Sequence, residues 1–202
     1  YSGSDQTGSV MLRDGGAAGG QIEFAAPNPS YRGYFGFSVG IDRADGVSED
    51  VVVGEPNRNT NGFIGAVHFY RTTRISGLLQ SAVHQRTVLA PRGTDLESFG
   101  HAVAVHNRWA AIGAQGDDTL GQTAGGAYLY DIVGNNLIPL VDPSTVAGDQ
   151  FGWDVAISDQ YVLVGNGHGN APSVSVFDAR TGAFIRRITN NGGGFGYSVA
   201  ID

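Results

Sequence analysis

Residues 42–50 hold the densest group of side chains that could bind a cation. The oxygen-bearing residues of this segment are Asp42, Asp45, Ser48, Glu49 and Asp50. Calcium takes about six to eight oxygen ligands, which carboxylates, hydroxyls, backbone carbonyls and water can supply together. The segment therefore predicts a Ca²⁺ site built from these five residues, with a plain acidic hairpin loop as the alternative.

Other polar residues give weaker indications of chemistry. Asp117 and Asp118 are adjacent in a glycine-rich stretch, where paired carboxylates are usually solvated turn residues. The five histidines show no metal-ligand spacing, and His101 and His106 should point to opposite faces of an extended segment. Gly-x-Ser-x-Gly, phosphate-loop and His-Glu-x-x-His motifs are missing. Because a catalytic triad can assemble from distant residues, these absences disfavour an enzyme without excluding one.

The amino-acid composition disfavours several classes of partner and site. The 19 acidic and 12 basic residues give a net charge of −7, which disfavours nucleic acid as a partner. No apolar run approaches the roughly 20 residues that a membrane span needs. The protein has no cysteine, which removes disulfides, thiolate nucleophiles and Cys-ligated zinc. Its 32 glycines, about twice the usual frequency, indicate many tight turns between short strands.

One phrase, Phe-Gly-x-x-Val-(Ala/Gly)-(Ile/Val), occurs four times. It begins at Phe35, Phe99, Phe151 and Phe195. The spacings of 64, 52 and 44 residues fall within or above the roughly 40–50 residues of a four-stranded propeller blade. We expect the four phenylalanines to be core residues that pack between blades, while the glycines let backbones approach closely.

The residues after each phrase continue the repeat. Second strands are predicted at 51–54, 110–113 and 162–165, third strands at 65–70, 126–130 and 173–177, and fourth strands near 87–90, 137–141 and 184–188. No segment has a sustained helical period. The predicted fold is therefore an all-β propeller of four-stranded antiparallel blades.

These motifs resemble the FG-GAP repeat of integrin α-subunits and of bacterial surface proteins. The best match is residues 34–56, where Gly54-Glu55-Pro56 stands at the place of the family's Gly-Ala-Pro. The second and third repeats have Gly113-Ala114-Gln115 and Gly165-Asn166-Gly167 there instead. In the family, the loop that corresponds to residues 42–50 is often a calcium cage. Here the match is imperfect, because Ala44 and Gly46 take two of the ligand positions.

The repeats also divide the chain. The predicted units are 1–33 as a partial blade, 34–98, 99–150 and 151–194 as whole blades, and 195–202 as the first strand of a further blade. Two interpretations stay open: a portion of a longer propeller, or incomplete ends that a neighbouring subunit completes by strand addition.

The resemblance implies an extracellular, secreted or cell-surface module. We expect it to be non-catalytic and to serve adhesion or structural assembly by binding a protein or glycan at a propeller face. For glycan stacking, the aromatic candidates are Tyr31, Tyr34, Trp109 and Trp153, although Trp153 is favoured as a core residue. One alternative is a filament or oligomer subunit. Another is a polysaccharide-active enzyme, which a cluster of His, Arg and carboxylates on the propeller axis would favour.

Overall fold

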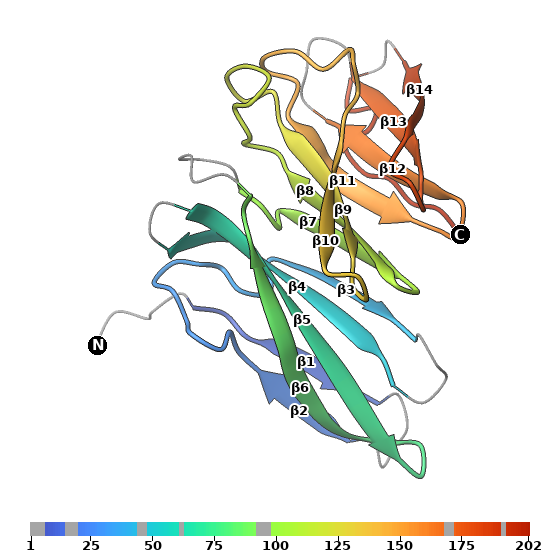
Figure 1. Ribbon diagram of the computed structural model, residues 1–202. Helices are drawn as coiled ribbons and strands as arrows, with labels where there is room; N and C mark the ends of the chain where they lie inside the picture. Colours follow the sequence, from blue (N-terminus) through green and yellow to red (C-terminus); the bar gives the residue numbers. More distant parts are fainter. Residues whose placement is uncertain are drawn as a thin grey trace.

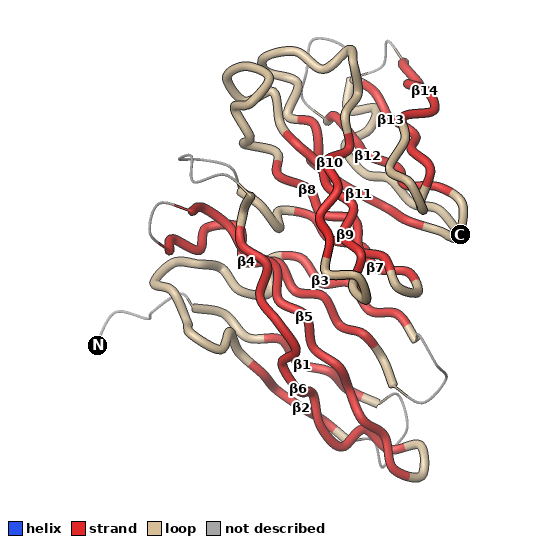
Figure 2. Tube along the Cα trace, viewed as in Figure 1, coloured by secondary structure: helices blue, strands red, loops and turns tan. Residues whose placement is uncertain are grey.

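Strands and their connections make up the whole of the described fold. The computed structural model describes residues 7–14, 20–43, 48–60, 63–91, 98–167, 172–190 and 193–202. In these ranges there is no helix, and so none long and apolar enough to cross a membrane. Figure 2 shows only strand and loop along the trace.

The strands form three antiparallel four-stranded sheets and one two-stranded sheet, each in chain order. The two-stranded sheet contains β1 (Val10–Arg13) and β2 (Gln21–Phe24). The first four-stranded sheet contains β3 (Ser38–Asp42), β4 (Asp50–Thr60), β5 (Phe63–Ile75) and β6 (Leu78–Leu89). The second contains β7 (Ala102–His106), β8 (Trp109–Ala114), β9 (Gly126–Asp131) and β10 (Asn136–Leu140). The third contains β11 (Phe151–Ile157), β12 (Tyr161–Asn166), β13 (Ser173–Asp178) and β14 (Phe184–Thr189).

This arrangement confirms the predicted all-β fold of blade-like sheets. The sheets follow one another in chain order, from β1 and β2 in blue to β14 in red (Figure 1). Residues 195–202, predicted as a first strand, take turn and irregular conformations instead. A strand needs a ladder partner, and the described residues hold no second strand that pairs with this segment.

The outer strands of the first sheet are longer than the sequence indicated. β5 and β6 extend to a tight hairpin at Ser76 and Gly77, both with positive φ (52° and 82°). Two successive residues with positive φ are typical of a type I′ hairpin turn, whose twist matches that of the strands. The fourth strand therefore begins at Leu78, well before the predicted position near Thr87.

Adjacent sheets touch backbone to backbone where their glycines meet. A Cβ added at Gly54 would lie 2.0 Å from the carbonyl oxygen of Gly100. Added at Gly113, it would lie 2.1 Å from the carbonyl oxygen of Gly152. Any side chain larger than hydrogen would overlap these atoms. The glycine that follows the apolar run of each second strand therefore sets the spacing to the Phe-Gly pair of the next repeat.

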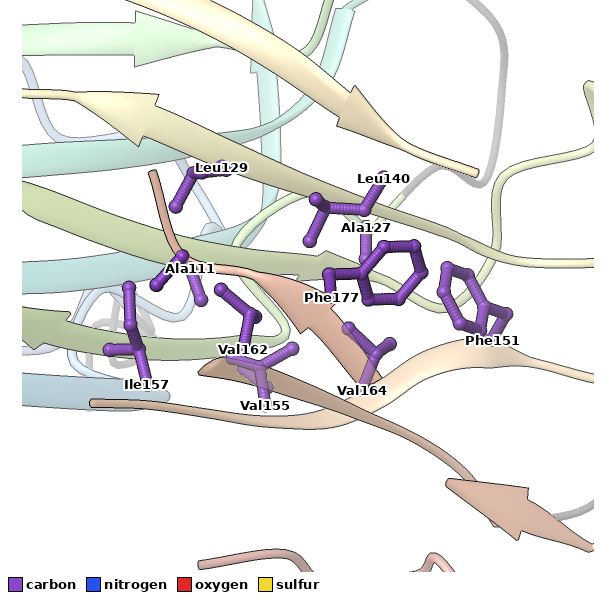
Figure 3. Close-up of a cluster of buried hydrophobic side chains, with 12 residues drawn as sticks. Ala111, Ala127, Leu129, Leu140, Phe151, Val155, Ile157, Val162, Val164 and Phe177 are labelled. Atoms are coloured by element: carbon purple, nitrogen blue, oxygen red, sulfur yellow. The ribbon is translucent and has the colours of Figure 1, made fainter. Parts of the chain in front are cut away.

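Apolar side chains fill each sheet-to-sheet interface. Figure 3 shows the cluster between the second and third sheets, where Phe151 and Phe177 lie beside Ala127 and Leu140. Phe35, Phe99 and Phe151 are buried, as predicted for core residues.

Phe195 is only partly buried, so the core prediction does not hold fully for the fourth phrase. The rings of Phe35 and Phe99 lie edge-on against His68 and Tyr128, on the third strands of their own sheets. No described third strand follows Phe195 to cover it in that way.

The Gly113 contact predicts a large loss of stability on substitution. Gly113→Ala should lower the free energy of unfolding by about 2–3 kcal/mol, because a backbone atom of Gly152 cannot move aside as a side chain could. Gly193→Ala is the matched control, since no atom lies within 4 Å of the added methyl group. Urea unfolding followed by circular dichroism measures both. Equal midpoints for the two variants would contradict the contact.

Candidate functional site

Four aromatic rings, one from each repeat, form a continuous row across the sheets. They are Phe37, His101, Trp153 and Tyr197, each directly after a Phe-Gly pair. Successive ring centroids lie 5.1, 5.0 and 5.0 Å apart, with interplanar angles of 45°, 51° and 46°. We call this set the aromatic row.

A repeated turn positions three of the four rings, and the fourth, Trp153, lies in β11. The backbone N–H groups of Phe37, His101 and Tyr197 donate to the carbonyl oxygens three residues earlier, at 3.0, 2.9 and 3.1 Å. The glycine before each ring has a φ between 82° and 90°. A positive φ at the third residue of such a turn requires glycine or a similarly permissive residue. The Phe-Gly phrase thus buries its first ring and directs the next one into the row.

The two ends of the row are the most accessible. Phe37 is 56% exposed and Tyr197 48%, while His101 and Trp153 between them are partly buried. Trp153 is therefore only partly buried, and its prediction as a core residue does not hold fully. Exposed aromatic faces of this kind stack on flat or apolar ligand surfaces, including sugar rings.

Burial lowers the pKa of His101. Its loss of hydration outweighs the hydrogen bond between its Nδ1 and the carbonyl oxygen of Trp153, at 3.1 Å, and the nearby charge of Asp154. His101 is therefore more readily neutral than a histidine in water. His106 lies elsewhere, 3.1 Å from Asp159, so the two histidines do not form one site.

The sequence contained a signal for the row that was missed. The position after each Phe-Gly pair carries an aromatic or imidazole ring in all four repeats, although its neighbours vary. Of the aromatic candidates named above, Tyr31 and Tyr34 are exposed, and Trp109 lies under the Arg108 guanidinium.

Residues of the predicted calcium loop make strand-pairing and hydrogen-bond contacts with other parts of the chain. Asp45 lies outside the described residues, and Asp42 and Asp50 face each other across the β3–β4 ladder. Asp42 Oδ2 accepts a hydrogen bond from the backbone N–H of Asn107, at 2.5 Å. Asp42 therefore links its loop to the β7–β8 turn of the next sheet.

Glu49 does not fit as a calcium ligand. Its Oε1 accepts from Arg74 Nε at 2.8 Å and its Oε2 from Thr72 Oγ1 at 2.6 Å, and Arg43 also contacts Oε1. Burial acts to raise the pKa of Glu49, but the hydrogen bonds from Thr72, Arg74 and Arg43 outweigh it and lower that pKa.

Within the described ranges, no three His, Asp or Glu side chains group as a metal site. Calcium binding at residues 42–50 stays a prediction, now resting on Asp42, Asp45, Ser48 and Asp50. Asp117 and Asp118, the second acidic pair, stabilise turns by accepting hydrogen bonds: the Thr119 N–H donates to Asp117 and the Thr123 N–H to Asp118.

Comparison with known protein families identifies the repeated sequence. Residues 83–130 and 139–177 match the sequence profile of the FG-GAP repeat. The chain therefore contains FG-GAP repeats. Its matched segments run from the fourth strand of the first sheet through the third strand of the third sheet.

Other comparisons add little to the FG-GAP assignment. No curated protein sequence matches the chain. Similar solved structures include a europium-containing methanol dehydrogenase, with 13% sequence identity and a TM-score of 0.43. That similarity covers 76% of this FG-GAP chain and 25% of the dehydrogenase, so the chain spans about a quarter of that protein's length.

The lowered pKa of His101 predicts a loss of stability in mild acid. In the unfolded chain the pKa returns toward its ordinary value of 6.5, so the unfolded state binds more protons as the pH falls through that value. Stability is therefore present above this pKa and declines below it. His101→Phe should flatten the dependence of unfolding free energy on pH between about pH 8 and pH 5. Denaturant unfolding across this range measures the slope, and an unchanged slope would contradict the burial of His101.

Proposed function

We propose that this FG-GAP protein is a non-catalytic extracellular module that binds a protein or glycan through the aromatic row. The observation that carries the proposal is the row itself, in which four repeats each contribute one ring at nearly constant spacing. A row of rings suits an extended ligand that stacks on several of them in turn.

Several features support this assignment. FG-GAP repeats are typical of extracellular proteins. The net charge of −7 favours solubility and disfavours nucleic acid. The row consists of phenyl, indole, phenol and imidazole rings, a set better suited to stacking than to acid–base catalysis. We therefore prefer a binding module to the polysaccharide-active enzyme.

Substitutions at the ends of the row test the proposal. Phe37→Ala and Tyr197→Ala should each weaken binding about tenfold, since each removes one stacking face. Val133→Ala is the matched control, because Val133 is 74% exposed and lies on the β9–β10 turn.

Trp153 reports on binding in a Trp109→Phe background, in which it is the only tryptophan. Its fluorescence can be followed during titration with cellohexaose, chitohexaose and a panel of aromatic-rich peptides. The proposal would be overturned if no probe perturbs Trp153, or if the Phe37 and Val133 variants behave alike.

A second candidate function is assembly with neighbouring subunits. Val39 and Ile41 on β3 are 43% and 51% exposed. They pair in register with Val53 and Val51, which pack against Val10 on the two-stranded sheet. The two-stranded sheet packs on β4 through Val10 but leaves the Val39 and Ile41 side chains of β3 exposed, and β1 has no described strand on its second side. Another subunit could supply strands at this place.

Native mass spectrometry tests the assembly candidate. We expect multiples of the single-chain mass of 21.1 kDa, and Ile41→Glu should return the protein to monomers because it places a charge in the apolar contact. Ile75→Glu is the control, at an exposed position on the β5–β6 hairpin. A wild-type protein that stays monomeric at high concentration would exclude assembly through this face.

A further inference from the structure

Each four-stranded sheet buries one carboxylate against an equivalent side chain of its third strand. His68, Tyr128 and Ser175 occupy the same register, opposite Val53, Ile112 and Val164 of the second strands. The carboxylates that contact them are Glu55, Asp117 and Asp142, which are 0%, 3% and 2% exposed.

The three contacts are similar although the carboxylates come from different parts of the chain. His68 Nε2 lies 2.8 Å from Glu55 Oε2. The hydroxyl of Tyr128 donates to Asp117 Oδ2 at 2.9 Å. Ser175 Oγ donates to Asp142 Oδ2 at 2.6 Å. Glu55 lies on β4, whereas the two aspartates lie on the loops after β8 and β10.

The surroundings of the three carboxylates differ in charge. Arg58 lies 2.9 Å from Glu55, and Arg187 lies 3.5 Å from Asp142. Asp117 receives hydrogen bonds from Tyr128 and from the Thr119 N–H, but no arginine or histidine in the described part of the chain pairs with it. A buried carboxylate without a cation is costly, because its lost hydration is only partly replaced.

A pocket of about 380 Å³ opens beside Asp117. Its walls are mainly apolar and include Leu120, Leu137, Pro139 and Phe151, while Asp142 adds a second carboxylate. A volume of this size lies within the range of small-molecule sites, which is about 300–1,000 Å³.

The loops around the pocket are held together by backbone hydrogen bonds. Gly148 N–H donates to the Gln122 carbonyl at 2.9 Å, and Gln150 N–H to the Thr123 carbonyl at 3.0 Å. These bonds join the β8–β9 loop to the β10–β11 loop, both at the same end of the second sheet (Figure 1). The pocket is therefore formed before any ligand arrives.

We propose that this pocket binds a small organic cation with an apolar body, whose ammonium group pairs with Asp117. The ligand would supply to the second sheet the positive charge that Arg58 supplies to the first and Arg187 to the third. Its apolar body would lie against Leu120, Leu137 and Phe151. The site is separate from the aromatic row, so it goes beyond the binding function proposed above.

Charge selectivity follows from the same geometry. Attraction between unit charges is stronger in a poorly hydrated pocket than in water. Asp117 and Asp142 together repel an anion, and Arg187 is already shared with Asp149 at 3.3 Å. The pocket should therefore select a cation over a neutral or anionic molecule of the same shape.

Three probes of similar shape test this selectivity. Ligand-observed NMR titration of the protein with 2-phenylethylammonium, 2-phenylethanol and 3-phenylpropanoate compares cation, neutral molecule and anion. We expect the cation to bind about tenfold more tightly than the alcohol, and the anion to bind more weakly than both. Equal affinities, or no binding of the cation up to about 10 mM, would overturn the proposal.

Two matched variants locate the site. Asp117→Asn should weaken binding of the cation about tenfold, to the affinity of the alcohol. Asp118→Asn, at the next residue, should leave the affinity for the cation unchanged. Asp118 is exposed, so the control makes the same charge change outside the pocket.

A third variant covers the case in which Asp117→Asn fails to fold. Leu120→Ala shortens a half-exposed side chain in the pocket wall. It should weaken binding of the cation and of the alcohol by the same factor, because it removes apolar contact alone. Unchanged binding in this variant, or in a folded Asp117→Asn protein, would place the cation elsewhere.

Discussion

Contact between the backbones of successive repeats is the constraint on which the rest of the structure depends. The glycine after the apolar run of one second strand lies against the glycine of the next Phe-Gly pair, as Gly54 does with Gly100 and Gly113 with Gly152. This contact brings β3, β7 and β11 side by side. The rings of the aromatic row start from these turns, so their spacing of about 5 Å follows from the spacing of the backbones. Core packing and the candidate binding surface therefore share one cause.

The sequence predicted the parts of this fold that repeat locally. Runs such as Val51-Val52-Val53-Gly54 are apolar, β-branched and end in glycine, which indicates a strand buried on both faces without further information. The extended β5–β6 hairpin was not predicted, because residues 71–86 mix polar and apolar side chains without a long apolar run, and their pairing depends on the turn at Ser76 and Gly77.

The candidate sites were harder to predict because they join residues far apart in sequence. Nothing near Glu49 indicates that Arg74, on the extended part of β5, takes one of its oxygens. The buried carboxylates likewise share no spacing: Glu55 precedes its partner His68, and Asp142 precedes Ser175 by 33 residues. Only the register of the third strands places these partners at equivalent positions. The ring after each Phe-Gly pair was visible, but its role depends on contact between repeats that a single repeat does not contain.

Residues 151–153, at the start of β11, link the two candidate sites. Phe151 lines the pocket beside Asp117, and Trp153, two residues later, belongs to the aromatic row. Gly152 between them contacts backbone on two sides, since an added Cβ there would lie 2.0 Å from the Gly126 carbonyl oxygen and 3.1 Å from the Ala114 nitrogen. Phe151 N–H also donates to the Ala124 carbonyl at 2.9 Å. Close-packed backbone on both sides leaves this segment little space to move, so the two candidate sites are held at a fixed separation. The Phe-Gly pair and the residue after it thus contribute Phe151 to the core and the pocket and Trp153 to the aromatic row, and the backbone contact at Gly152 fixes the separation of the two sites.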